Sequence, residues 1–161
     1  MNFATIYALI LGGGVIAFLL WKAPSSSPKA TERRGPLSSL EASLRKLADL
    51  HNESALIALT AARKQDRFEI RHVDGQYRIE YQTIHAYQEQ NVQNIRNALE
   101  SLQLDVQEWG DGSDGWDKYI FAEMGGDPKV ALHRIEYVLA HCANVNAGSE
   151  LTISLQDFRP G

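Results

Sequence analysis

The segment from Trp109 to Asp117, WGDGSDGWD, contains residue types that often bind phosphate or a metal ion. Gly110 and Gly115 are spaced like the glycines of half a phosphate loop, whose backbone N–H groups surround the phosphate. Such a loop also needs Lys followed by Ser or Thr, and Trp116 and Asp117 stand there instead. The segment therefore lacks the positive charge that phosphate binding requires.

Calcium is the metal ion that this segment suits best, because Asp111, Ser113, Asp114 and Asp117 all offer oxygen ligands. Their spacing is not that of an EF-hand loop, and no bidentate Glu closes the segment. We therefore interpret the segment first as an acidic hairpin turn, second as a contact for a partner protein and third as a calcium site. We expect no metal and no other cofactor.

Zinc-binding residue types occur at His133, His141 and Cys142, on one predicted helix. His133 is eight and nine residues from the other two, and neighbouring positions on a helix diverge by about 100°. Cys142 falls on the apolar face of that helix, which predicts a buried, inert thiol. The chain also lacks a nucleophile elbow, a zinc-protease helix and a dinucleotide fingerprint, so we expect no enzyme.

Aromatic residues alternate with other residues around Tyr77 and Tyr81 and again at Tyr119 and Phe121, as on sheets that stack RNA bases. Those sheets carry Lys or Arg followed by Gly before the aromatic residues, and Asp-Lys precedes Tyr119 here. We expect no nucleic acid partner, and we assign these aromatic side chains to the core or to a protein contact.

Charge is divided unevenly along the chain. Residues 1 to 35 carry four basic groups and one acidic group, whereas residues 36 to 161 carry twelve basic and nineteen acidic groups, a net charge of −7. Such a field raises the rate of encounter with cationic partners and disfavours polyphosphates. Eight of the acids lie between residues 100 and 127, against Lys118 alone. The predicted contacts for a basic protein partner are Glu108, Asp111, Asp114, Trp116 and Asp117.

An uncharged run from Phe3 to Trp21 predicts one membrane span, with Phe3, Trp21 and Lys22 as its anchors. At 1.5 Å per residue, a helix of this length reaches about 28 Å, close to the hydrocarbon thickness of a bilayer. A cleaved signal peptide is the alternative, but it needs a basic start and a small-residue cleavage site, and neither is evident. The small residues Ala4, Ala8 and Gly12 are spaced by four, which would allow two spans to pack together as a homodimer.

Basic residues follow the apolar run and none precedes it. The positive-inside rule then predicts a single-pass protein of the cell inner membrane with its domain in the cytoplasm, the alternative being a periplasmic or extracellular domain. A single cysteine agrees with a reducing compartment. The residues expected to face an anionic leaflet are Lys29, Arg33 and Arg34.

Three regions follow from these observations: a membrane anchor at residues 1–22, a flexible basic linker at 23–36 and one soluble domain at 37–161. The linker holds three of the five prolines and several serines. The domain, of about 125 residues, is long enough for one core.

The domain begins with a helix from about residue 39, where Ser38 and Glu41 form a capping-box pattern. Residues 55–64 are also helix-compatible, so 39–64 is one bent helix or two. A hairpin follows, because Asp74-Gly75 lies between two alternating runs, and a two-residue turn places Ile70 opposite Ile79. On the outer face we expect diagonal contacts Arg71/Glu80 and Glu69/Arg78.

The remaining pattern predicts a helix with the apolar stripe Val92, Ile95, Leu99 and Leu102, strands at 104–109 and 117–123, a helix opened by Asp127-Pro128, and a final strand after Gly148. This order predicts an α+β domain of ferredoxin-like (split βαβ) form, with an extra helix and strand at its N-terminus. The extra strand is expected to displace the last strand from its usual position.

The leading functional hypothesis is a membrane-anchored, protein-binding module of adaptor, inhibitory or immunity type that presents an acidic hairpin to a cationic protein. The alternative is an ACT-like regulatory domain that dimerises edge to edge and senses a small ligand.

Overall fold

The computed structural model describes residues 30–61, 66–83, 89–110 and 118–159. No helix within these ranges is long and apolar enough to cross a bilayer. The predicted span, including Phe3, Trp21 and Lys22, lies outside the described residues, as does Lys29. The membrane anchor therefore stays a prediction.

Seven strands form one antiparallel sheet in the order β1-β7-β2-β3-β4-β6-β5. The strands are β1 (Thr31–Pro36), β2 (Leu56–Ala61), β3 (Arg67–Val73), β4 (Gln76–Thr83), β5 (Val106–Trp109), β6 (Lys118–Gly125) and β7 (Glu150–Gln156). Strands β2 and β3 stand between β4 and β7, so the last strand does not neighbour β4.

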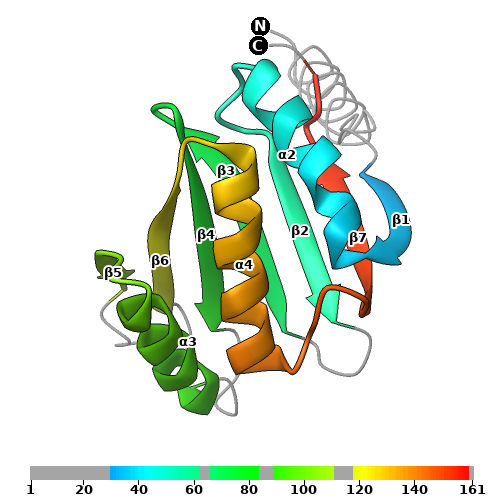
Figure 1. Ribbon diagram of the computed structural model, residues 1–161. Helices are drawn as coiled ribbons and strands as arrows, with labels where there is room; N and C mark the ends of the chain where they lie inside the picture. The colour runs from blue at the N-terminus through cyan, green and yellow to red at the C-terminus, as the bar shows by residue number, and fades with distance from the viewer. Residues whose placement is uncertain (1–29, 62–65, 84–88, 111–117, 160–161) are drawn as a thin grey trace, which may run out of the picture.

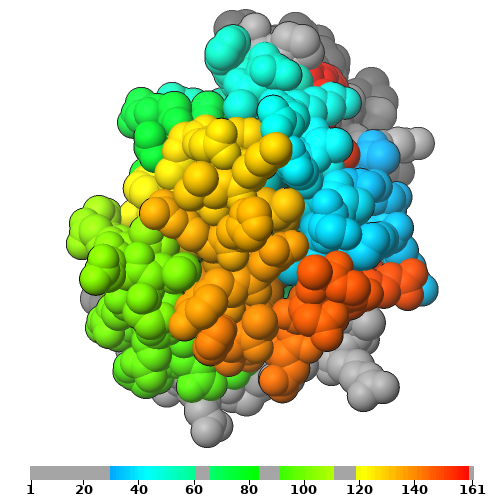
Figure 2. Space-filling view, in the orientation of Figure 1, coloured from blue at the N-terminus to red at the C-terminus, as the bar shows by residue number. Residues whose placement is uncertain are grey.

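The helices of the described residues all cover one face of this sheet (Figure 1). They are the short 3-10 helix η1 (Leu37–Ser39), α2 (Leu40–Asp49), α3 (Glu89–Ser101) and α4 (Pro128–Ala143). Helix α4 lies between α2 and α3 and packs against both (Figure 2). The predicted α+β architecture, with helices on one face of an antiparallel sheet, is confirmed.

Helix α4 begins where the sequence predicts, because Asp127 caps it. The Asp127 carboxylate accepts hydrogen bonds from the backbone N–H of Lys129, at 2.8 Å, and of Val130, at 3.0 Å. Asn144 ends the helix in the left-handed conformation, with φ of 53°. The predicted apolar face is buried and consists of Ala131, Ile135, Val138, Leu139 and Cys142.

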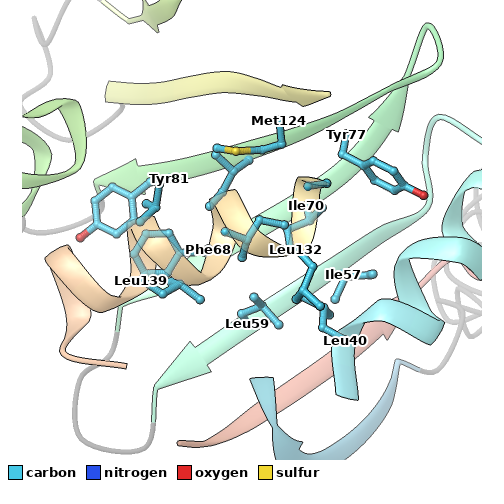
Figure 3. Packing of buried hydrophobic residues seen from close by; sticks show 14 of the residues in the cluster. Leu40, Ile57, Leu59, Phe68, Ile70, Tyr77, Tyr81, Met124, Leu132 and Leu139 are labelled. Carbon is cyan, nitrogen blue, oxygen red and sulfur yellow. The ribbon is translucent and has the colours of Figure 1, made fainter. Parts of the chain in front are cut away.

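The core lies between the helices and the sheet and includes two tyrosines whose hydroxyls point to opposite ends of it (Figure 3). The Tyr77 hydroxyl donates to the backbone oxygen of Leu44 at 2.9 Å. The Tyr81 hydroxyl donates to the carboxylate of buried Asp66 at 2.8 Å. Both hydroxyls can be buried because each has an acceptor.

The hairpin β3-β4 forms with the predicted register, Ile70 opposite Ile79. Asp74 and Gly75 both have positive φ, 50° and 76°, as the tight turn between twisted strands requires. The turn thereby determines which side chains of both strands face the helices.

The charged face of this hairpin is only partly as predicted. Arg71 donates from Nε to the Glu80 carboxylate at 3.0 Å, which confirms one diagonal pair. Arg78 pairs with Glu123 of β6 instead of Glu69, with 2.7 Å between the nitrogen and the oxygen. Sequence reasoning missed this contact because it considered one hairpin and not the next strand of the sheet.

The helix-compatible prediction for residues 55–64 is wrong, because Leu56–Ala61 is strand β2. This strand lies between β7 and β3 and is buried on both faces, with Leu56 and Ala58 as well as Ile57 and Leu59 in the interior. A strand buried on both faces shows no alternation of apolar and polar residues, so its pattern resembles that of a short buried helix. The Ser38 capping box is also absent: Ser39 is the N-cap of α2, and its side chain makes no cap hydrogen bond.

The boundary between linker and domain also needs correction. Residues 31–36, which the sequence assigns to the flexible linker, form β1 and pair with β7 from Thr31 opposite Leu155 to Pro36 opposite Glu150. Backbone hydrogen bonds to one neighbour hold an edge strand, so apolar side chains are not needed to form it. The sequence pattern therefore gave no signal of this strand.

We predict that Gly126→Ala destabilises the fold, because a Cβ there would lie 2.8 Å from the backbone oxygen of Gly75. The loop before α4 would have to move away from the β3-β4 turn. We expect a loss of about 1–3 kcal/mol in the free energy of unfolding, measured by urea denaturation of the full-length chain.

Gly148→Ala is the matched control, since the nearest atom to its added Cβ is 3.6 Å away. This variant should change the free energy of unfolding by less than about 1 kcal/mol. Equal losses in the two variants would show that the contact with the turn is not what constrains Gly126.

We also predict a pH-dependent contribution from Asp127. Hydrogen bonds from the backbone N–H groups of Val130 and Lys129 lower the pKa of its carboxyl group. The stabilisation is therefore present above the unfolded-state pKa of about 3.9 and is lost as the pH falls through the lower folded-state pKa. Asp127→Asn keeps a capping oxygen that does not titrate.

The wild-type protein should therefore lose thermal midpoint relative to Asp127→Asn as the pH falls below about 4. The comparison cancels the acid sensitivity of the other carboxylates, which both proteins share. A constant difference in midpoint from neutral to acidic pH would contradict the prediction.

Candidate partner-binding surface on the helix-free face of the sheet

The predicted contact residues are only partly within the described structure. Asp111, Asp114, Trp116 and Asp117 lie outside it. Glu108 is exposed on β5 and forms an ion pair with Arg96 of α3. Its carboxylate is therefore on the helix side of the sheet, and its role as a partner contact stays a prediction.

The two predicted leaflet-facing arginines in the described structure differ in their surroundings. The Arg33 guanidinium donates to the backbone oxygen of Ser39 and to the Ser43 hydroxyl, both at 3.0 Å, and so holds β1 against the start of α2. Arg34 is exposed. Whether either residue faces a leaflet stays a prediction.

The two groups of alternating aromatic residues, Tyr77 with Tyr81 and Tyr119 with Phe121, lie on opposite faces of the sheet. Tyr77 and Tyr81 face the helices and are buried. Tyr119 and Phe121 alternate with buried Ile120 and Ala122, so they lie on the face opposite the helices of the described residues, which we call the helix-free face. The prediction of a core position therefore holds for the first pair and not for the second.

Trp109 joins the second pair, because β5 and β6 pair with Trp109 opposite Tyr119. The two rings have their centroids 5.6 Å apart at an angle of 47°. Glu80 of β4 lies on the other side of β6, opposite Phe121. These four residues, Glu80, Trp109, Tyr119 and Phe121, line a hollow of about 220 Å³ that we call the aromatic hollow.

Trp109 is the most exposed large apolar side chain of the described residues, with 69% of its surface accessible. Sequence reasoning missed it because it treated Trp109 as the first residue of the acidic loop. The sequence carried no signal for its face, because that face is set by the pairing of β5 with β6, which puts Trp109 opposite Tyr119.

Basic side chains already contact the margin of the aromatic hollow. The Arg78 guanidinium carbon lies 5.0 Å from the centroid of the Phe121 ring, within the range of a cation–π interaction. Arg71 donates to the Glu80 carboxylate. The hollow thus combines aromatic rings and a carboxylate, two kinds of group that attract a positive charge.

A second hollow, of about 310 Å³, lies between α3 and α4. The Ser101 hydroxyl there donates to the backbone oxygen of Ala98 at 2.8 Å, so Tyr137 supplies the proton in the 3.0 Å contact between the two hydroxyls. His141 stacks on the Tyr137 ring. The Ser101 hydroxyl thus donates its hydrogen bond to a carbonyl oxygen rather than to a base, which is not the arrangement of an activated nucleophile.

The three candidate zinc ligands of α4 each contact a backbone carbonyl one turn earlier. His133 contacts that of Lys129, at 2.8 Å, His141 that of Tyr137, at 2.7 Å, and the Cys142 thiol donates to Val138, at 2.7 Å. Cys142 is buried as predicted. Within the described ranges, no three His, Cys, Asp or Glu residues come together in a way that could hold a metal ion.

The chain matches no protein-family model, and it has no significant match among curated proteins or solved structures.

We predict that the Trp109 side chain is not required for folding. Trp109→Ala should change the free energy of unfolding by less than about 1 kcal/mol, because it removes one exposed ring contact. Ile120→Ala, on the neighbouring strand but 2% exposed, should cost about 2–5 kcal/mol. If urea denaturation gives Trp109→Ala a comparable loss, the indole instead holds the sheet edge together.

Proposed function

We propose that this protein is a membrane-tethered, protein-binding module whose contact surface is the edge formed by β5 and the aromatic hollow. The observation that carries the proposal is the exposed Trp109 side chain that lines this hollow. Exposing an indole to water is unfavourable, and tryptophan is among the residues that contribute most to binding at protein interfaces.

The position of Trp109 in the sheet supports the same proposal. Strand β5 is the last strand in the order and has only four residues, so one of its edges has no strand neighbour among the described residues. An unpaired edge can accept a strand from another protein, and Trp109 would then lie beside the added strand. The partner would then be bound both by backbone hydrogen bonds to β5 and by contact with the Trp109 ring.

A cationic partner follows from charge. The part of the chain from residue 36 onward has a net charge of −7, and the sequence between β5 and β6 contributes Asp111, Asp114 and Asp117. We propose that these acids speed the approach of a basic protein, while the aromatic residues supply the close contact. An inhibitory or immunity-type protein that covers a basic effector is one form of this function.

The tether is the second part of the proposal. The uncharged run at residues 3–21 would span the inner membrane, and the basic residues after it would hold the domain on the cytoplasmic side. We further propose that β4-α3-β5-β6-α4-β7 is a ferredoxin-like unit into which the strands β2 and β3 are inserted.

Site-specific crosslinking in the native membrane tests the proposal. A photoreactive amino acid replaces Trp109 in the full-length chain, and the matched control carries it at Ala140, an exposed position of α4. We expect a discrete adduct with one protein from position 109 and none from position 140. The adduct should weaken with added salt and in the chain with Asp111, Asp114 and Asp117 replaced by Lys.

The outcomes separate the hypotheses. Equal labelling from both positions, or no effect of the three lysines, would contradict a cationic partner at this edge. An adduct between two copies of the chain would instead favour the alternative, an ACT-like domain that dimerises edge to edge, because β5 is the edge that such pairing would use.

A further inference from the structure

We propose that the aromatic hollow binds the guanidinium group of an arginine side chain presented by the partner. This inference rests on the proposed function and names the partner group that the hollow recognises. The hollow presents the rings of Trp109, Tyr119 and Phe121 together with the Glu80 carboxylate. A planar cation can stack on such rings while it donates hydrogen bonds to the carboxylate.

The protein itself shows that this surface accommodates a guanidinium. Arg78 lies over the Phe121 ring, 5.0 Å from its centroid, and its charge is paired with Glu123. Two residues further along β4, the Glu80 carboxylate stands opposite Phe121 on the same face, so a carboxylate and an aromatic ring are again neighbours. Trp109 and Tyr119 supply the rings there, and tryptophan is the most favourable face for a cation.

Glu80 retains the capacity to bind a second donor. Arg71 donates to Oε2 of Glu80 at 3.0 Å, and a carboxylate accepts about four hydrogen bonds in all. An acidic side chain in the hollow would be repelled by the negative charge of Glu80. A neutral side chain would leave the remaining acceptor sites without a charged donor.

The size of the hollow favours one side chain over a metabolite. Its volume of about 220 Å³ is below the range of roughly 300–1,000 Å³ that is typical of small-molecule sites. An arginine also fits the proposed strand addition, because its long side chain could reach the rings from a strand paired with β5. The occupant of the hollow is therefore an arginine side chain of a protein partner.

Fluorine NMR of the full-length chain in non-ionic detergent tests this inference. The three tryptophans are replaced by 5-fluorotryptophan, and Trp109→Phe identifies the Trp109 signal. N-acetyl-L-arginine N-methylamide should move that signal in a saturable way, with a dissociation constant on the order of millimolar, as a few contacts of about 1 kcal/mol would give. The Trp21 signal, from the predicted span, should not move.

The neutral isostere N-acetyl-L-citrulline N-methylamide and the lysine analogue are the ligand controls. We expect both to bind more weakly than the arginine probe, because citrulline lacks the charge and lysine lacks the planar group. Equal binding of citrulline would overturn recognition of the charge. Equal binding of lysine would overturn the assignment to a guanidinium.

Two single substitutions test the role of the carboxylate. Glu80→Gln should weaken arginine binding about three- to fivefold, the effect expected of a partly exposed ion pair. Glu69→Gln is the matched control, because Glu69 also pairs with Arg71 and stands directly opposite Glu80 but is not part of the hollow. Equal weakening in both variants would contradict a direct role for Glu80.

The two proposals can fail separately. If the arginine probe leaves the Trp109 signal unchanged while the crosslink from position 109 persists, the arginine inference is wrong and the binding surface stands. If the probe binds but no partner adduct forms, the hollow recognises guanidinium and the proposed protein-binding function is wrong.

Discussion

The two-residue turn at Asp74-Gly75 is the constraint on which the rest of the structure depends. Both residues adopt positive φ, and this fixes the register of β3 against β4. A slip of one residue would turn the buried side chains of these central strands to the other face. The helices could then no longer cover an apolar surface, and Glu80 would leave the aromatic hollow. Gly126 couples the turn to the start of α4, because only a residue without Cβ fits beside the Gly75 carbonyl.

Strands β2 and β3 separate β4 from β7 in the middle of the sheet. They widen the sheet between β4 and β7, and α4 crosses over this wider interval to connect β6 with β7. On the helix-free face, acids and arginines of β3, β4 and β6 pair across strands, as in Arg71 with Glu80 and Arg78 with Glu123. Towards β5 this lattice gives way to aromatic residues. The contact surface that we propose therefore lies at the β5 end of this face, next to charged side chains that already pair with one another.

Sequence reasoning succeeded where local chemistry determines the structure. Asp74-Gly75 requires a turn and Asp127-Pro128 starts a helix whatever the rest of the chain does, so both were predictable. Strand β2 was not, because burial on both faces removes the alternation that identifies a strand. Strand β1 was not predictable either, because it is held by backbone pairing with β7 and not by a pattern of apolar side chains. Of the candidate site, the negative charge was visible in the sequence. The shared position of Trp109 and Glu80 in one hollow was not, because it depends on the pairing of β4, β6 and β5, which are separated along the chain.

The strand order also fixes a distance. β1, which continues from the predicted tether, and β5, which carries Trp109, are the opposite edges of the sheet. Six steps of about 4.8 Å between neighbouring strands separate these edges by roughly 29 Å. That separation exceeds three Debye lengths of about 8 Å at physiological ionic strength. The sheet thus separates β5 from the end of the domain that the predicted tether would enter. A basic protein bound at β5 would lie beyond the electrostatic reach of charges at that end.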